Sequence, residues 1–263
     1  MFPTIELFGK TLGTYALCAL VGILCAGFCA ARLCEKRGET DADAVAVGLF
    51  ALIGTLIGGH ILYAITNLDT LIKLFGALDR ISAKSFFELF WDQIGGMVFF
   101  GGLYGGILAA YLYVRKKKLP LGVYGDAYAV ALPLFHFFGR IGCFLGGCCY
   151  GVESAFGFTM HSAPFAPANG VNRFPVQLLE SACNFALFVI LLILYKKEKA
   201  KGKLLPVYLA GYSVIRFSDE FLRGDEIRGH LWIFSTSQWI ALITLLVLGL
   251  VFGVRKLRRR KEV

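Results

Sequence analysis

The sequence has few charged residues, and this scarcity argues against a soluble protein. Only 17% of its 263 residues are charged, against about a quarter in soluble domains, while 57% are hydrophobic. A soluble fold of this composition would leave much apolar surface in water. Intrinsic disorder is excluded too, because disordered segments combine low hydrophobicity with high charge. The composition therefore predicts an integral membrane protein.

Other patterns are also missing. The sequence lacks heptad repeats, which excludes a coiled coil. Its eight cysteines are spread thinly, unlike those of a disulfide-stapled secreted module. Its four histidines form no ligand pattern such as HExxH, so we expect neither a metal site nor a cofactor. No linker, low-complexity tract or internal repeat interrupts the chain, which predicts a single transmembrane domain over residues 1–263.

Seven apolar stretches are long enough to cross a bilayer, which requires about 17–25 largely apolar residues in each helix. The segment 68–90 is too polar to span and predicts an amphipathic interfacial arm. The expected fold is therefore an all-α integral membrane protein of about seven helices. The predicted spans are 12–31, 44–66, 94–114, 121–145, 176–195, 204–222 and 231–254.

The positive charges predict the orientation of these helices. The net charge of +9 would suit a nucleic-acid partner, but lysine and arginine cluster in short loops between the apolar stretches. Eighteen of them lie in one set of alternate loops and seven in the other. Cytoplasmic loops carry the excess of positive charge in membrane proteins. We therefore expect the N-terminus outside, the C-terminus in the cytoplasm, and the lipid bilayer rather than a nucleic acid as partner.

Ionisable residues inside the spans are the strongest functional signal, because each costs about 2.5–3.5 kcal/mol at the helix centre. Arg140 lies between Gly139 and Gly142, which allow another backbone or a ligand headgroup to come close. An arginine that extends to the interface is the alternative interpretation. Further along, Arg216 and Glu220 share a helix face, as do Asp219 and Arg223. A buried structural ion pair is the alternative there, but two acids and two bases within eight residues favour a functional site.

The segment from Arg173 to Glu180 opens the fifth predicted span. Pro175 is an ordinary helix-start signal, and Gln177 is partly explained in the same way. Glu180 lies one turn deeper and is not explained by helix initiation. The glycine pairs of the third span favour close helix packing, and we interpret them as packing residues rather than as functional ones. These glycines are Gly95, Gly96, Gly101, Gly102, Gly105 and Gly106.

Three cysteines cluster after Arg140. Cys143, Cys148 and Cys149 form a spacing that matches no standard zinc motif, whereas a disulfide or a reactive thiol stays open. The arginines with nearby carboxylates, amides and tyrosines suit a phosphate, since the planar guanidinium binds it with paired charge-assisted hydrogen bonds. A membrane offers such a phosphate in the lipid headgroup. The residues alone thus predict a lipid-handling enzyme or a lipid transporter.

Five ordered blocks over nearly the whole chain resemble the bacterial prolipoprotein diacylglyceryl transferase family. Seven transmembrane helices with the N-terminus outside, as this family has, agree with the charge count. The blocks are Tyr15, Gly95–Leu103, Gly139–Gly142, Arg173–Glu180 and Gly211–Arg223.

The resemblance implies transfer of the diacylglyceryl group of phosphatidylglycerol to the lipobox cysteine thiol of a preprolipoprotein, in the bacterial cytoplasmic membrane. The products are a thioether-linked precursor and glycerol phosphate. Arg140 and Arg216 would hold the phosphate and Glu220 would orient Arg216. The resemblance also implies substrate-binding positions at Tyr15, Gly101, Gly102, Arg173, Gln177, Glu180 and Tyr212.

The chain departs from the family pattern at several positions. The family's usual histidine before Gly101 is Phe100, and its usual asparagine and acidic residue are Cys143 and Cys148. The arginine typical of the second span is His60. His136, one turn before Arg140 on the same face, is a candidate substitute base. A histidine that only hydrogen-bonds a carbonyl on a neighbouring helix is the alternative.

Two rival hypotheses stay beside the enzyme. A lipid or small-anion transporter on the same scaffold predicts transport without a covalent product and paired broken-helix repeats, which the sequence lacks. A non-catalytic membrane protein, in which the arginines only pack, is the other.

Overall fold

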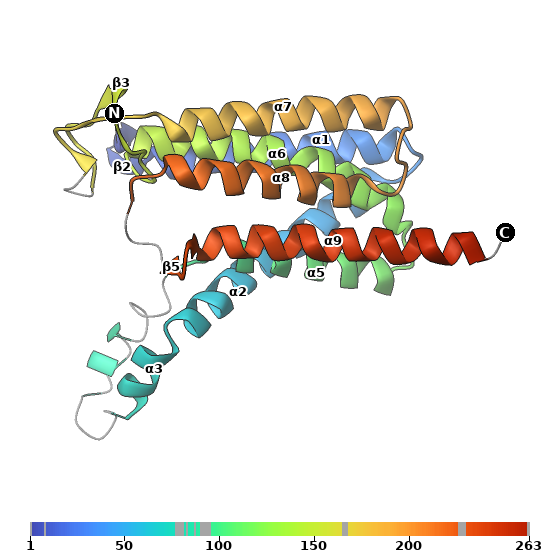
Figure 1. The fold of residues 1–263 in the computed structure, drawn as a ribbon, viewed down its shortest axis with the longest axis horizontal. Coiled ribbons are helices and arrows are strands. Elements are labelled where there is room, and N and C mark those ends of the chain that lie inside the picture. Colours follow the sequence, from blue (N-terminus) through green and yellow to red (C-terminus); the bar gives the residue numbers. More distant parts are fainter. Residues whose placement is uncertain are drawn as a thin grey trace. The chain divides into compact units, whose positions relative to one another are not determined.

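The computed structural model describes residues 2–7, 9–76, 82, 84–86, 88–89, 96–164, 168–225 and 230–261. Long helices dominate these residues (Figure 1). They are α1 (Thr14–Glu35), α2 (Asp41–Thr66), α3 (Leu68–Phe75), α5 (Phe99–Lys116), α6 (Leu121–Gly146), α7 (Val176–Lys196), α8 (Leu204–Asp219), the short 3₁₀ helix η3 (Glu220–Leu222) and α9 (Thr236–Lys261).

Short antiparallel strand pairs join some of the helices. The pairs are β1 (Thr4–Leu7) with β2 (Lys10–Gly13), β3 (Glu153–Thr159) with β4 (Asn172–Arg173), and β5 (His230–Leu231) with β6 (Phe234–Ser235). The all-α prediction missed them; apart from β3, these strands have only two to four residues, too few to show a clear alternating pattern. Pairing satisfies the backbone hydrogen-bonding groups of these connections.

Among the described residues, five helices are long and apolar enough to cross a membrane, which confirms the predicted membrane class. They are α1, α2, α6, α7 and the segment Thr236–Val254 of α9. The other two predicted spans correspond to α5 and α8, which have 18 and 16 residues. Both are at or below the lower end of the usual spanning length, because α5 closes on Arg115 and Lys116 and α8 ends at Asp219.

The chain divides into two compact units, which are described separately. The first consists of residues 1–38 and 122–263, and the second of residues 39–121. The single domain expected from the sequence therefore stays a prediction.

The first unit is a bundle in which small residues allow close helix contacts. A Cβ at Gly142 of α6 would lie 2.9 Å from Cys18 Cβ and 3.2 Å from Tyr15 Cα, both on α1. Gly211 of α8 similarly faces Leu187 of α7. The close contact at Gly142 confirms that this glycine admits another backbone next to Arg140.

The end of this unit remote from Arg140 is fixed by polar contacts. Asp126, which is buried, accepts hydrogen bonds from the backbone N–H groups of Gly202 and Leu204, where α8 begins. The Tyr195 hydroxyl donates to the Leu33 carbonyl over 2.6 Å, joining α7 to α1. These bonds fix the helix ends, and hence the relative heights of the side chains along the bundle.

The second unit is held by glycines on two helices. Gly101 and Gly105 of α5 face Gly58 and Gly54 of α2 so closely that a Cβ on any of the four would overlap the opposite backbone. The small-xxx-small interpretation of the α5 glycines is therefore confirmed, with a matching pair on α2 that the sequence reading missed. Gly95 lies outside the described residues.

The segment 68–90, predicted as an interfacial arm, is described only in part. Its first portion is α3, where Leu71 and Leu74 are buried while Asp69 and Lys73 are exposed. This pattern fits an amphipathic helix. Its placement at a membrane interface stays a prediction.

Candidate active site

Arg140 and Glu180 form a buried ion pair between two helices of the first unit. Arg140 projects from α6 and Glu180 from the second turn of α7, and Arg140 Nη2 lies 2.8 Å from Glu180 Oε1. The side chains are 16% and 1% exposed. Arg140 therefore has an acidic partner on another helix, and the alternative of an arginine extending to the interface does not describe this geometry.

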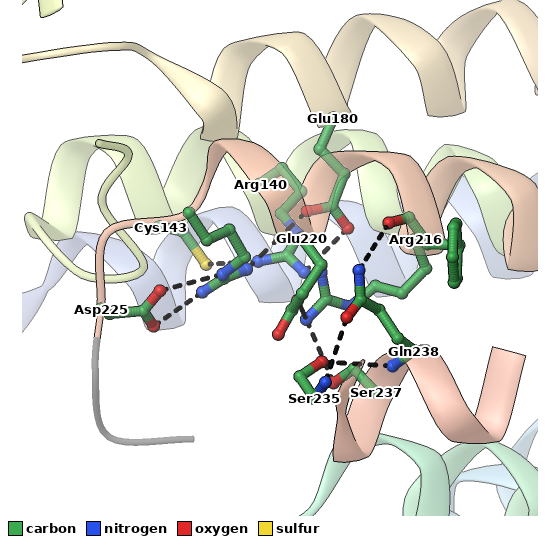
Figure 2. A network of polar contacts seen from close by, with 11 residues as sticks. Arg140, Cys143, Glu180, Arg216, Glu220, Asp225, Ser235, Ser237 and Gln238 are labelled. Atoms are coloured by element: carbon green, nitrogen blue, oxygen red, sulfur yellow. Dashed lines mark hydrogen bonds and ion pairs between the residues drawn. The ribbon is translucent and has the colours of Figure 1, made fainter. Parts of the chain in front are cut away.

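Arg216 and Glu220 form a second ion pair in the same polar network (Figure 2). Arg216 Nη2 lies 2.6 Å from Glu220 Oε2, as the four-residue spacing predicted, and both side chains are under one tenth exposed. Arg216 Nη2 also donates to Ser237 Oγ of α9 over 3.2 Å. Arg216 Nη1 is buried with no hydrogen-bond partner among the described residues.

Arg223 completes the network through Asp225, which the sequence prediction did not include. Its guanidinium binds both oxygens of Asp225, at 3.0 and 2.9 Å, and Arg223 Nη1 lies 4.0 Å from Glu180 Oε2. Although burial disfavours its charged form, the hydrogen bond to Asp225 holds the pKa of Arg223 above its ordinary value. The predicted shared face of Asp219 and Arg223 is wrong, because α8 ends at Asp219 and the chain continues as the 3₁₀ helix η3.

His136 lies one turn before Arg140 and contacts α7. Its Nδ1 is 3.3 Å from Asn184 Oδ1, and its ring centroid is 4.8 Å from that of Tyr212. Asn184 in turn donates to the Glu180 carbonyl over 2.8 Å. His136 thus faces a neighbouring helix and hydrogen-bonds a side-chain carbonyl oxygen there, much as the structural alternative expected.

Arg173 and Gln177 hold the loop that follows α6. Arg173 Nη1 donates to the Gly151 carbonyl over 3.2 Å, and its guanidinium lies over the Tyr150 ring. Gln177 Nε2 donates to the Cys148 carbonyl over 2.8 Å. Gln177 Oε1 is buried and lacks a partner within the part of the chain that the structure describes. Both side chains thus fix this loop.

The three cysteines after Arg140 gather where α6 ends. The sulfur atoms of Cys143, Cys148 and Cys149 all lie within 4.8 Å of one another, and none of the three forms a disulfide with another described residue. Arg140 Nη1 lies 3.9 Å from Cys143 Sγ. Hydrogen bonds with Cys143 and Cys148 lower the pKa of Cys149, and Arg223 and Arg140 lower it further, against the effect of burial.

Comparison with known proteins shows the family of this chain. The family model described as prolipoprotein diacylglyceryl transferase matches residues 4–254. The chain belongs to this family.

Its relatives match over most of their length. A phosphatidylglycerol–prolipoprotein diacylglyceryl transferase of Clostridium tetani is 33% identical over 257 residues, which are 97% of this chain and 98% of that protein. A protein of the same name, numbered 2, from Clostridium perfringens is 35% identical over 259 residues, 98% of this chain and 96% of its own. An Idiomarina loihiensis transferase is 35% identical over 211 residues, 78% and 73% of the two chains.

The structure of this family member brings most of the predicted site residues into the first unit. Arg140, Glu180, Arg216 and Glu220 lie in one network (Figure 2). Tyr15 packs beside Gly142, and the Tyr212 ring is tilted against that of His136. Substrate contacts of all these residues stay predictions.

Other predicted residues belong to the second unit. Gly101 lies against Gly58, and Gly102 faces Thr55, so both serve helix packing there. Phe100 is buried and its ring stacks on Tyr104. His60 Nδ1 lies 3.0 Å from the Gly96 carbonyl oxygen. A role for Gly101 and Gly102 in substrate binding stays a prediction.

Sequence reasoning missed several members of the network. Ser237 reaches Arg216 only through the packing of α9 on α8. Asp225 binds Arg223 two residues away, and Asn184 lies one turn after Glu180 on α7. Gln238 donates to the Phe217 carbonyl over 3.4 Å and accepts from the Ser235 N–H, fixing the start of α9 beside Arg216. The Ser-x-x-Gln spacing of Ser235 and Gln238 is a capping-box pattern and could have revealed this helix start.

Proposed function

We propose that this protein transfers the diacylglyceryl group of phosphatidylglycerol to the lipobox cysteine of preprolipoproteins. The observation that carries the proposal is one polar network in which Arg140 and Arg223 face Glu180 and Arg216 pairs with Glu220. The Arg216 Nη1 donor is left unsatisfied among the described residues. Buried polar donors are almost always paired, so an unsatisfied guanidinium N–H favours an anionic ligand. Family membership supports the phosphate of phosphatidylglycerol as that ligand.

The reaction requires charge stabilisation and removal of one proton. The substrate thiol loses its proton, and its sulfur attacks the glyceryl carbon that bears the phosphate. A carbon–sulfur bond forms, the carbon–oxygen bond breaks, and its electron pair leaves with the phosphate oxygen as glycerol phosphate. Arg140 and Arg216 would stabilise the charge of this leaving group. Glu180 and Glu220 would hold the two guanidinium groups in place, while Tyr15 and Tyr212 would position the lipid headgroup or the peptide.

We also propose seven transmembrane helices in a single domain, with the N-terminus outside and the C-terminus in the cytoplasm of a bacterial cell. The charge asymmetry of the loops supports this orientation. The helices α5 and α8 would cross as the two shortest spans. Cysteine accessibility at Lys118→Cys and Lys201→Cys tests the orientation, because both are expected to react with a membrane-impermeant reagent only after the membrane is opened.

The test of function uses the protein reconstituted in phosphatidylglycerol vesicles with a lipobox peptide. Mass spectrometry is expected to find one diacylglyceryl group on the peptide cysteine. A peptide with serine in that position is the matched control and should gain no mass. A folded protein that binds the lipid but yields no adduct would favour the transporter on the same scaffold.

Arg216 and Glu220 are expected to act as one unit. Removing either partner leaves a charge unpaired in a buried site, so each single change should weaken transfer strongly. A double-mutant cycle with Arg216→Gln and Glu220→Gln should show a coupling energy in transfer above about 0.5 kcal/mol. The control cycle pairs Arg216→Gln with Glu35→Gln, whose exposed side chain pairs with Arg32. Additive losses in the first cycle would show that Arg216 and Glu220 act independently.

His136 tests which group takes the thiol proton. Because His136 contacts Asn184 and lies against Tyr212, we expect a positioning role and transfer by His136→Gln within about twofold of wild type. The measurement is the transfer rate across the neutral pH range. A general base contributes about 10²–10⁴-fold, so a loss of that size, with the pH dependence removed, would make His136 the base.

A further inference from the structure

The thiols of Cys143, Cys148 and Cys149 are brought together by the way α6 ends. The N–H of Gly147 donates to the Phe144 carbonyl, and the N–H of Cys148 donates to the Cys143 carbonyl. This is the Schellman arrangement, with Gly147 at φ 72° in the left-handed conformation that favours glycine. The chain therefore turns back over the last turn of α6, which brings the thiols of Cys148 and Cys149 close to the thiol of Cys143.

The positions of the three thiols are also held from outside the turn. Gln177 on α7 donates to the Cys148 carbonyl over 2.8 Å. Cys149 has φ 55°, a conformation that costs free energy in a residue other than glycine. A Cβ at Gly147 would lie 2.9 Å from Ala163 Cβ, so the turn packs tightly on the following loop. Such a supported cluster has the preorganisation that metal sites need.

We propose that these three cysteines hold one zinc ion, and that the fourth coordination position takes the thiol of the lipoprotein cysteine. The catalytic role of this zinc site rests on the transferase function proposed above. The absence of a standard motif predicted no metal here, but that expectation rested on spacing along the chain rather than on the turn. Thiolates are preferred ligands of zinc.

The sulfur positions fit a tetrahedral zinc ion after a small adjustment. Zinc–sulfur bonds of about 2.3 Å place neighbouring sulfur atoms about 3.8 Å apart in a tetrahedron. The three sulfur atoms already lie within 4.8 Å of one another. Of the residues that the structure describes, no fourth cysteine, histidine or carboxylate ligand joins them. Three protein ligands with one open position are typical of catalytic zinc, whereas structural sites are closed by four.

The surrounding charges suit such a site. Zinc with four thiolates carries two negative charges, and the Arg140 guanidinium lies 3.9 Å from Cys143 Sγ. The same Arg140 that would hold the lipid phosphate is thus next to the metal ligands. A phosphate on Arg140 would place the glyceryl carbon close to a thiolate on zinc.

The zinc ion would replace a dedicated protein base. A thiol that coordinates zinc is deprotonated outright at neutral pH, and its proton passes to water. The zinc-bound sulfur then attacks the glyceryl carbon, the carbon–oxygen bond breaks, and glycerol phosphate leaves. The resulting thioether is a neutral, weaker ligand, so the lipidated peptide dissociates and the three-cysteine site is regenerated. No electron is gained or lost, and zinc is unchanged.

Metal content and cobalt spectroscopy test the site without reference to activity. Purified wild-type protein is expected to retain one equivalent of zinc, and the double variant Cys148→Ser/Cys149→Ser less than about a tenth of that. The control variant Cys25→Ser/Cys29→Ser, altered on α1, should retain the full equivalent. In cobalt-substituted wild type, the thiolate-to-cobalt absorbance should rise by about a third when a cysteine lipobox peptide supplies a fourth thiolate. A serine peptide should leave it unchanged.

The outcomes separate this proposal from the proposed function. Adduct formation by wild-type protein that holds no zinc, or by protein stripped of zinc, would overturn the zinc site and leave the transferase standing. Zinc-loaded wild type that shows the cobalt response but forms no adduct would refute the transferase and keep the metal site. Copper(I) in place of zinc would overturn the identity of the metal. A cobalt spectrum that does not change when the peptide is added would overturn the open coordination position. The wild-type spectrum decides these points even if the double variant fails to fold.

Discussion

Replacing Arg140 with lysine is expected to lower diacylglyceryl transfer by at least about a hundredfold, the size seen when one preorganised charge-stabilising donor is removed. Lysine keeps the charge but loses the planar fork, which here reaches Glu180 at 2.8 Å and Cys143 at 3.9 Å at the same time. The measurement is the initial rate of adduct formation in phosphatidylglycerol vesicles, with the amount of inserted protein determined in parallel.

Arg32→Lys is the matched control for this change. Arg32 also pairs with a glutamate, Glu35, but both side chains are more than half exposed, so its replacement should leave transfer unchanged. Near-normal transfer by Arg140→Lys would contradict a phosphate-clamping role and favour a guanidinium that only packs.

Replacing Glu180 with glutamine is expected to destabilise the protein by about 3–5 kcal/mol, the usual cost of breaking a buried ion pair by removing one partner. Glu180 is 1% exposed, and its two oxygens face Arg140 and Arg223, so the change leaves two guanidinium groups without this counter-charge. Thermal unfolding in detergent measures the loss, and we expect transfer to fall with it.

Glu35→Gln provides the comparison for stability. It removes the carboxylate of an exposed pair, which is worth at most about 1 kcal/mol. Equal melting temperatures for wild type and Glu180→Gln would mean that Glu180 does not hold the two arginines. A Glu180→Asp variant, which keeps the charge on a shorter side chain, should recover part of the stability.

The class of protein and one of the ion pairs could be predicted from the sequence, because both depend on local patterns. Apolar runs predicted the five helices that satisfy the length for spanning. The four-residue spacing predicted the contact between Arg216 and Glu220. An apolar run was sufficient for the helices, and the four-residue spacing was sufficient for the ion pair.

The rest of the network depends on contacts between helices and on where a helix ends. Arg140 and Glu180 are 40 residues apart, and only the packing of α6 on α7 brings them together. Arg223 pairs with Asp225 rather than Asp219 because the helix ends at Asp219. A helix boundary shifted by one turn was enough to change the partner, and such boundaries are the least certain part of a sequence reading.

The cysteines show how chain spacing can mislead. Cys143, Cys148 and Cys149 match no zinc motif, yet the Schellman turn at Gly147 gathers their sulfur atoms within 4.8 Å. Gly147 itself is the sequence signal, since glycine after the last helical residue is typical of this turn.

The stoichiometry of the two products tests transferase activity most directly. Phosphatidylglycerol labelled in its phosphate is incubated with the reconstituted protein and the cysteine lipobox peptide, and released glycerol phosphate and diacylglyceryl peptide are counted in the same sample. Transfer predicts one glycerol phosphate for each thioether formed, and neither product with the serine peptide. Glycerol phosphate released without thioether, or labelled lipid moved between leaflets with neither product, would contradict it.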